Sequence, residues 1–390
     1  MTKRRTYERT HPWLTFEIDL RRFSSDIWMR LGACASKCTH IAGAPLSPEV
    51  EKRLNRMYLV RGAFATTAIE GNTLTEDEVN RHLQGELFLP PSRRYLGREI
   101  DNVVDAFNTL TERIRLDGTA RISPELIRWM NGKVLEGLQV DEGVVPGEFS
   151  KAPLVVGRYR CAPPEDRSFL IARLCKTLNE FPVDKEHATA YAILKAIFAH
   201  LYLVWIHPFG DGNGRTARLL EFHILTAASL PYPVTHLLSN YYNFTRSEYY
   251  RHLDQASGAK YGHIAFFDYA VEGLRDGLLE QIEEIRKQQI SVSWVNFVHE
   301  YFEQSVSKAD RRRRMVVLAL TEHGPAAARR IPQLTPALTS EYHDKSLRTV
   351  SRDINALLDA ELIIRAGDRI EANTSMIEAF LPWRNLAGGE

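Results

Sequence analysis

The chain has 390 residues, of which 44% are hydrophobic and 25% are charged, with 50 basic and 49 acidic side chains. This length supports two or three domains with sizeable cores, and the near-zero net charge excludes a global attraction to nucleic acid or to an anionic membrane. The most apolar stretch, residues 190–206, is interrupted by Lys195 and His200, and no apolar segment follows the basic N-terminus. A cytoplasmic protein with no membrane partner is expected.

Four cysteines are present, and their spacing does not predict a metal site. Cys34 and Cys38 lie four residues apart, but no second pair completes a zinc ligand set. The thiols are expected to be free and buried.

Residues 1–114 are expected to be mostly helical. Within them the segment Thr66-Thr67-Ala68-Ile69-Glu70-Gly71-Asn72 indicates, when taken alone, the end of a helix with Gly71 at its C-cap. A second local pattern follows at residues 144–164, where the β-branched run Leu154-Val155-Val156-Gly157 is bounded by glycine and proline. Such a run predicts a short β-hairpin.

Residues 190–206 predict a buried helix, because their apolar side chains recur at the i, i+3, i+4 spacing of a helix. Pro208 and the glycines that follow end this helix, and another helix is expected from Arg215 onward. Glycines at 210, 212 and 214 allow a backbone to approach phosphate oxygens closely. The glycine loop thus leads into a helix N-terminus, where free amides and the helix dipole favour an anion.

The charged residues of this loop fit the same chemistry. Asp211 is an oxygen ligand suited to Mg²⁺ held between phosphates. Arg215 and Arg218 lie three apart in the first helical turn, so both can point toward one bound polyphosphate. His207 titrates near neutrality and can take a proton from an attacking hydroxyl. The alternative is a glycine-rich turn capped by a structural histidine, which the combination of residues disfavours.

The twelve residues from His207 to Arg218 resemble the signature of the Fic family, HPF-x-D/E-GN-G/K-R-x-x-R, at every defined position. Members of this family mostly transfer AMP from ATP to a protein hydroxyl. Gly214 stands where the related Doc-type kinases carry lysine, which favours nucleotidyl over phosphoryl transfer. The resemblance implies that His207 is the catalytic base, that Asp211 holds Mg²⁺, and that ATP is bound by Gly212, Asn213, Gly214, Arg215, Thr216, Ala217 and Arg218.

Far upstream of this loop in the sequence, the segment at 66–72 is similar to the family's inhibitory helix, S/T-x-x-x-E-G/N. The resemblance implies inhibitory roles for Thr66, Glu70 and Gly71. A Glu70 carboxylate near Arg218 would form a bidentate ion pair and occupy the place that a γ-phosphate needs. ATP would then bind with its α-phosphate poorly aligned for attack.

The predicted hairpin resembles the family's flap, which pairs with an incoming target strand by β-augmentation. Leu154, Val155, Val156 and Gly157 would then lie along the nucleotide site, although a plain connecting hairpin is the alternative. Ser150 departs from the family pattern, in which many relatives carry arginine, so flap anchoring and target choice stay open. Tyr249 and Tyr250 are candidates for walls of the adenine pocket, and packing is the alternative for them.

The last hundred residues predict helices at 311–321, 336–342 and 346–358, followed by a hairpin over 362–371. This order resembles a winged helix-turn-helix domain. Arg348, Thr349, Ser351 and Arg352 would lie on its recognition helix.

DNA binding by this region is an open alternative that its charge does not favour. Residues 291–390 contain 13 basic and 13 acidic side chains, whereas DNA-binding domains usually carry a basic excess. The arginines at 311–314 can equally form a solvated helix face or pair with neighbouring acids. A role in dimerisation or target presentation is preferred.

Taken together, the sequence predicts a mainly α fold: a Fic-type helical core with a small β-hairpin flap, plus a C-terminal winged helix-turn-helix domain. The expected domains are an N-terminal helical region at 1–114, a catalytic core at 115–285 and a winged-helix domain at 290–390.

The expected function is Mg²⁺-dependent transfer of AMP from ATP to a Ser, Thr or Tyr hydroxyl of a target protein, and of itself, held back by Glu70. The alternatives are a Glu70-dependent hydrolase that removes AMP, or a nucleotide-sensing DNA-binding regulator. The target protein stays unidentified, and a homodimer that couples to release of the inhibitory helix is an open expectation.

Overall fold

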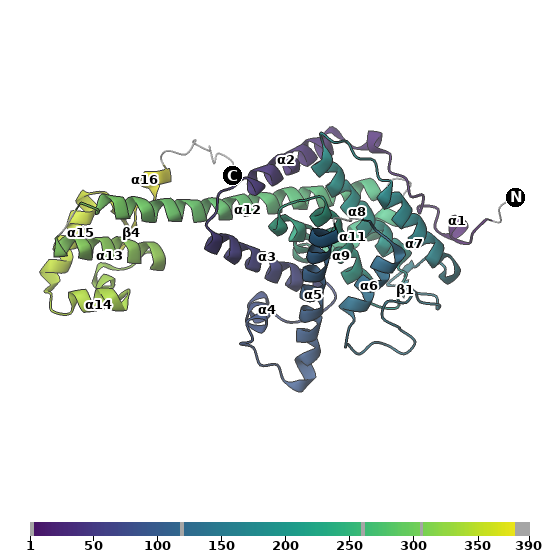
Figure 1. The fold of residues 1–390 in the computed structure, drawn as a ribbon, viewed down its shortest axis with the longest axis horizontal. Coiled ribbons are helices and arrows are strands. Elements are labelled where there is room, and N and C mark those ends of the chain that lie inside the picture. Colours follow the sequence, from purple (N-terminus) through teal and green to yellow (C-terminus); the bar gives the residue numbers. More distant parts are fainter. Residues whose placement is uncertain (1–3, 118–120, 259–261, 305–306, 379–390) are drawn as a thin grey trace. The chain divides into compact units, whose positions relative to one another are not determined.

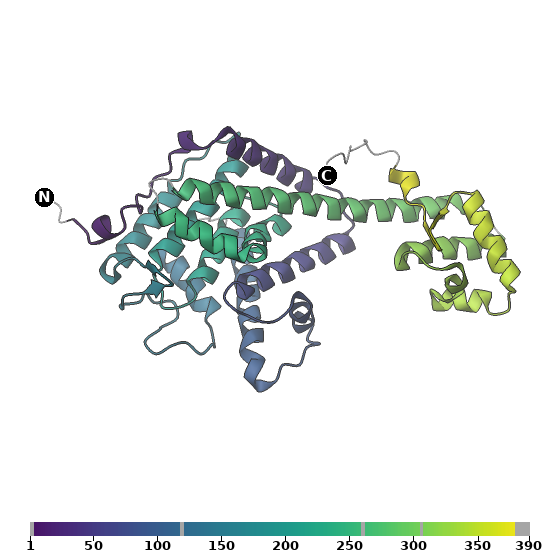
Figure 2. The same ribbon diagram turned by 180° about the vertical axis from the view of Figure 1, so that it is seen from behind.

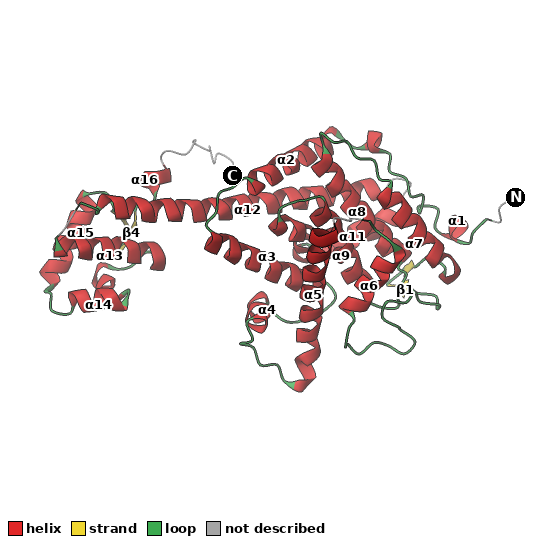
Figure 3. Cartoon of the chain, in the orientation of Figure 1, coloured by secondary structure: helices red, strands yellow, loops and turns green. Residues whose placement is uncertain are grey.

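The computed structural model describes residues 4–117, 121–258, 262–304 and 307–378. The chain divides into two compact units, residues 1–282 and 283–390. Each is mainly helical, and the strands of the described residues form two short antiparallel hairpins (Figure 1 and Figure 3). The predicted mainly α fold class is thereby confirmed.

The first unit is built from helices joined by turns and by a longer loop between α6 and β1, and it can be followed from both sides in Figures 1 and 2. Its helices are α1 (Tyr7–Thr10), α2 (Ser25–Ala42), α3 (Pro48–Ala68), α4 (Glu76–Leu83), α5 (Arg94–Asp117), α6 (Pro124–Val134), α7 (Pro164–Asn179), α8 (Ala188–Ile206), α9 (Asn213–Ala227), α10 (Leu237–Phe244), α11 (Arg246–Gly258) and the start of α12 (Gly262–Tyr301), with 3-10 turns at Leu20–Arg22, Pro91–Arg93 and Tyr232–His236. The strands are β1 (Val155–Val156) and β2 (Tyr159–Arg160), which pair antiparallel.

Helix α8 forms the centre of this unit. It is long and apolar enough to cross a membrane by length and composition, but 78% of its most apolar stretch is buried inside the protein. A helix that is hydrophobic on all sides is typical of a protein interior. It packs most extensively against α9, and α9 in turn lies against α3, α5 and α6. The end of α8 and the start of α9 are therefore held from several directions.

Helix α3 begins and ends with local signals that its sequence supplies. Ser47 caps its N-terminus by accepting a hydrogen bond from the Val50 amide, and Pro48 occupies the first turn. At its other end the Asn72 amide donates to the Thr67 carbonyl at 3.1 Å, with Gly71 at φ +101°. This is the geometry of a glycine-closed helix end. Glu70 is therefore presented at a fixed point just beyond the helix.

The four cysteines are buried and free, as the sequence predicts. Burial raises the pKa of each thiol, and Cys161, the lowest of the four, has a pKa of about 11. Neutral thiols are poor nucleophiles and metal ligands, so these residues act as small apolar side chains in the core.

The second unit has the predicted order of helices and hairpin. Its elements are the part of α12 from residue 283 onward, α13 (Lys308–His323), a 3-10 turn (Ala328–Gln333), α14 (Pro336–Tyr342), α15 (Leu347–Asp359), β3 (Ile363–Ala366), β4 (Arg369–Ala372) and α16 (Ser375–Glu378). Strands β3 and β4 pair antiparallel, and Ala326 bridges to Ile370. Arg348, Ser351 and Arg352 are exposed on α15, and Thr349 is partly buried there. The assignment as a winged helix-turn-helix stays a prediction.

Two arginines of the run at 311–314 are used inside this unit. The buried Asp353 carboxylate accepts hydrogen bonds from Arg312 Nε at 2.7 Å and Arg313 Nε at 3.3 Å. It also accepts one from the Tyr342 hydroxyl at 3.1 Å. Pairing with an acidic side chain therefore accounts for two of the four arginines at 311–314.

Replacing Asp353 by asparagine is expected to destabilise the second unit by about 3–5 kcal/mol, because it leaves buried Arg312 without a compensating charge. Hydrogen exchange of residues 307–378 in the full-length protein, measured against urea concentration, would give the change. Asp359→Asn, at the exposed end of the same helix, is the matched control. Equal stability of the two variants would contradict the expectation.

Candidate active site

His207 lies at the junction where α8 ends. It adopts the left-handed conformation, with φ 48° and ψ 61°, and its amide donates to the Leu203 carbonyl. Its Nδ1 lies 3.3 Å from the Val204 carbonyl oxygen. Because a carbonyl can only accept, this contact assigns the ring proton to Nδ1 and leaves the lone pair on Nε2. The imidazole is therefore held as a proton acceptor.

Burial lowers the pKa of the His207 imidazole to about 4. The ring is neutral at pH 7 and becomes protonated in the folded state only as the pH approaches 4. An NMR titration should show an inflection there instead of near the ordinary value of about 6.5. The unfolded chain takes up this proton near pH 6.5, so the free energy of unfolding should fall as the pH drops below that value. An inflection near 6.5, assigned by comparison with His207→Asn, would contradict the burial.

The loop after His207 is fixed by two asparagine side chains. Asn213 accepts from the Phe209 amide at 3.0 Å and donates to the Phe209 carbonyl at 2.8 Å. Asn131, buried on α6, donates to the Asp211 carbonyl at 2.8 Å and accepts from the Gly147 amide at 2.9 Å. The amides at the start of α9 are thus presented in a set geometry, as a phosphate nest requires.

Two predicted ATP contacts in α9 lie inside the protein. The Thr216 hydroxyl donates to the Gly212 carbonyl at 2.7 Å, and Ala217 is fully buried. Their side chains therefore support the helix start, and their backbone amides belong to the same first turn.

Glu70 and Arg218 form an ion pair, with Arg218 Nη2 2.5 Å from Glu70 Oε1. The same nitrogen donates to the Thr66 carbonyl at 2.9 Å. The predicted bidentate geometry is wrong, because one guanidinium nitrogen serves both partners and only one carboxylate oxygen is engaged. Burial alone would raise the pKa of Glu70, but the Arg218 charge and hydrogen bond outweigh burial and hold that pKa below its usual value.

Gly214 allows Glu70 to come this close. A Cβ atom at position 214 would lie 2.1 Å from Glu70 Oε1. Any larger residue would therefore displace the carboxylate. The segment at 66–72 and the loop therefore meet at this glycine.

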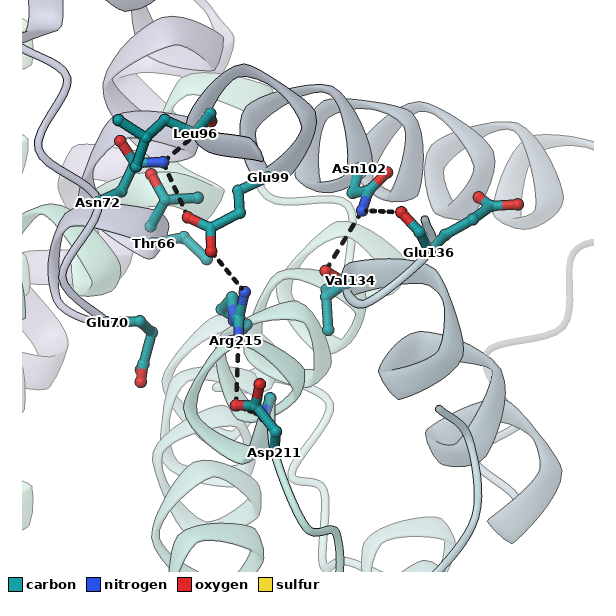
Figure 4. Close-up of polar contacts among 12 residues, drawn as sticks. Thr66, Glu70, Asn72, Leu96, Glu99, Asn102, Val134, Glu136, Asp211 and Arg215 are labelled. Atoms are coloured by element: carbon teal, nitrogen blue, oxygen red, sulfur yellow. Dashed lines mark hydrogen bonds and ion pairs between the residues drawn. The ribbon is translucent and has the colours of Figure 1, made fainter. Parts of the chain in front are cut away.

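Arg215 is paired with Glu99 and Asp211, and its charge also acts on Glu70, the partner of Arg218. That both arginines point toward one bound polyphosphate stays a prediction. Nη1 of Arg215 lies 3.4 Å from Glu99 Oε1, and its Nη2 lies 3.2 Å from Asp211 Oδ1 (Figure 4). Asn72 Nδ2 donates to Glu99 Oε2 at 2.8 Å. Glu99, from α5, thus links the segment at 66–72 to the loop. Its pKa is raised, because burial outweighs the Arg215 charge.

Asn102 forms further hydrogen bonds from α5, to the helix α6 that lies beside the loop. Its side chain donates to the Val134 and Glu136 carbonyls at the end of α6 (Figure 4). Because Asn131 also belongs to α6, this contact steadies the helix that holds the Asp211 carbonyl.

The hairpin of β1 and β2 forms where the flap is predicted, with Gly157 in the turn at φ +58°. Val155 and Val156 are exposed, which leaves their side chains free for a partner, and Leu154 is partly buried. The Tyr159 hydroxyl donates to the Trp205 carbonyl at 2.8 Å, and Phe149 bridges to Phe209. The hairpin is therefore anchored beside the end of α8.

The two candidate adenine residues differ in position. Tyr249 is buried, and its hydroxyl lies 2.9 Å from His200 Nε2, so it packs in the core in this structure. Tyr250 is 45% exposed, and its hydroxyl donates to the Ile69 carbonyl at 3.2 Å. Of the two, Tyr250 has a ring accessible to a ligand.

Asp211 suits a magnesium ion that is shared with phosphates. Mg²⁺ usually takes one or two carboxylates and completes its shell with phosphate oxygens and water. The Asp211 side chain is half-exposed, and its Oδ1 accepts from Arg215 and from the Gly212 amide. The described residues contain no group of three His, Cys, Asp or Glu side chains that could hold a metal alone. Any ion here would therefore depend on the nucleotide for most of its ligands.

In a comparison with known proteins, residues 121–225 match the model of the Fic/DOC family. The chain is 30% identical over 206 residues to protein adenylyltransferase fic-1 of Caenorhabditis elegans, and this alignment covers 53% of this chain and 38% of that protein. It is 30% identical over 224 residues to protein adenylyltransferase Fic of Drosophila ananassae, and this alignment covers 56% of this chain and 42% of that protein. The chain thus spans about two fifths of the length of these relatives.

Solved structures show a similar fold. A Fic family protein from Desulfovibrio desulfuricans has a TM-score of 0.53 at 20% identity and covers 89% of this chain and 94% of that one. Fic-1 from C. elegans has a TM-score of 0.55 at 23% identity, and the alignment covers 72% of this chain and 76% of that one. Residues 121–225 of the first unit therefore match the Fic/DOC family, within a fold shared with solved Fic proteins.

Proposed function

We propose that this protein transfers AMP from ATP to a hydroxyl group of a target protein and of itself, releasing pyrophosphate, and that Glu70 restrains the reaction. The observation that carries the proposal is the placement of His207. Its Nε2 lone pair is free beside a loop whose amides open the N-terminus of α9. A proton acceptor next to an anion site is the combination that nucleotidyl transfer requires.

In the proposed reaction, His207 Nε2 takes the proton of the target hydroxyl. The hydroxyl oxygen attacks the α-phosphorus in line, the bond from the α-phosphorus to the bridging oxygen breaks, and pyrophosphate leaves. The α9 amides and Arg218 stabilise the charge that develops on the phosphates. A magnesium ion held by Asp211 would neutralise part of the same charge.

Restraint by Glu70 follows from its ion pair with Arg218. While the carboxylate is present, the guanidinium is paired with it and with the Thr66 carbonyl. The terminal phosphate of ATP would have to compete with a negative charge at the same arginine. The nucleotide then binds in a pose that is poorly aligned for attack.

The reaction class can be tested by incubating the Glu70→Gly enzyme with Mg²⁺ and ATP labelled on either the α- or the γ-phosphate. Protein-bound label from the α-position alone is expected. Label from the γ-position would establish a kinase instead. No protein-bound label from either, with ATP binding intact, would overturn AMP transfer.

A second function uses the same residues in the opposite direction. The Glu70 charge acts on His207 as well as on Arg218, so the carboxylate lies near both the base and the phosphate arginine. There it could orient a water molecule that removes AMP from a modified protein. Release of AMP from pre-modified protein by wild type, and its loss in Glu70→Gly, would favour this hydrolase.

A further inference from the structure

Arg167 is a basic residue that the structure buries completely, in the first turn of α7. Its Nε donates to the Ala162 carbonyl at 3.1 Å. Its Nη1 donates to the Ser150 carbonyl at 2.5 Å and to the Ala152 carbonyl at 2.8 Å. Ser150 and Ala152 precede β1, and Ala162 follows β2. One guanidinium therefore joins both ends of the flap hairpin.

The hairpin has little of its own to hold it in place. Each strand contributes two residues, and an isolated two-stranded hairpin is marginal in water even when it is longer. A planar guanidinium with a fixed fork of donors suits this task, because it can bind several carbonyls at set angles. The flap position is thus determined by α7 and by the Tyr159 contact with the end of α8, as well as by the strand pairing.

A contribution to stability alone is a poor explanation for a buried guanidinium at position 167. Arg167 forms no ion pair with any residue that the structure describes, and burial lowers the pKa of its guanidinium. Its Nη2 is buried without a hydrogen-bond partner. Burying a cation without an acid costs free energy, which hydrogen bonds to carbonyls offset only in part.

The clamped segment is also tied directly to the catalytic loop. The Ser150 amide donates to the Pro208 carbonyl at 2.9 Å, and Pro208 follows His207 in the chain. Phe149 and Phe209 form a bridge beside it. Ser150 is therefore held on one side by Arg167 and on the other by the residue next to the base.

We propose that Arg167 is the positioning residue of the flap, which sets the hairpin relative to His207 so that an added target strand presents its hydroxyl to Nε2. This inference rests on the proposed AMP transfer. Arg167 takes no part in the chemistry and acts through the Ser150, Ala152 and Ala162 carbonyls. A shift of about 1 Å in a positioned group can cost about 100-fold in rate, so loss of the clamp should be visible in catalysis.

The test compares Arg167→Met and Arg167→Lys in the Glu70→Gly background. Arg167→Met is expected to lower the maximal rate of self-labelling from α-labelled ATP by about 10- to 100-fold. The half-saturating ATP concentration should change far less than the rate, because the contacts of the α9 loop remain. Lysine should restore part of the rate, since its ammonium can still donate to carbonyls but lacks the fork.

Arg173→Met is the matched control. Arg173 lies on the same helix but donates to the Tyr7 hydroxyl and the Thr15 carbonyl, outside the flap. It should leave the rate at the parental level. Parental labelling by Arg167→Met would overturn the proposal. A parallel loss of ATP affinity would do so too, because it would place Arg167 in support of the nucleotide site.

Hydrogen exchange separates this inference from the proposed function. In Arg167→Met, amides of residues 150–162 should exchange faster, whereas those of α8 and α9 should keep their protection. If the Glu70→Gly parent fails to label at all, the proposed transfer fails, and the exchange measurement still decides whether Arg167 holds the flap. Unchanged exchange at 150–162 would show that it does not.

Discussion

Replacing His207 by alanine is expected to lower AMP transfer by about 10²- to 10⁴-fold, the usual contribution of a positioned general base. The physical reason is the tautomer. Nδ1 is engaged with the Val204 carbonyl, so Nε2 carries the lone pair that would receive the proton. The initial rate of protein labelling from α-labelled ATP, compared with that of the Glu70→Gly parent, measures the effect.

Two further variants separate loss of the base from other effects of the substitution. His207 has φ 48°, a conformation that strains alanine but that asparagine tolerates. His207→Asn should therefore keep the backbone of the loop while removing the base. His40→Ala, at an exposed position of α2, serves as the control for loss of a histidine. Transfer that survives both changes at position 207 would rule out this residue as the base.

Glu70→Gly is expected to raise self-labelling by about 5- to 150-fold, which corresponds to a coupling free energy of about 1–3 kcal/mol. Removing the carboxylate leaves buried Arg218 without its ion-pair partner. The phosphates of ATP can then supply the missing negative charge. ATP should consequently raise the midpoint of thermal unfolding more in this variant than in wild type.

Two different substitutions of Glu70 separate the effect of its charge from the effect of its side-chain volume. Glu70→Gln keeps an oxygen that can accept from Arg218 but has no charge, so its rate should fall between those of wild type and Glu70→Gly. Glu86→Gly, in the exposed loop after α4, should behave as wild type. Glu70→Gly activity at the wild-type level, with ATP binding intact, would contradict an inhibitory role for Glu70.

Local features of this protein were readable from its sequence. The apolar run at 190–206 and the glycines after it predict one helix end and the next helix start, and the structure has α8 end at Ile206 and α9 begin at Asn213. The flap hairpin and the helices of the last hundred residues also lie where the sequence predicts them. Each of these depends on residues close in the chain, where periodicity, proline and glycine act directly on the backbone.

Contacts between distant segments were decided only by the tertiary structure. Glu99 lies 116 residues from Arg215 in the chain, and no motif marks it. Arg167 likewise belongs to no recognised pattern, although Ser150 left the anchoring of the flap open. Partner choice for a charged side chain depends on which helices pack side by side and which groups they bury together. The sequence by itself therefore determined the chemistry of the loop, whereas the packing of α3, α5 and α7 around it decided which residues hold that loop and the flap in place.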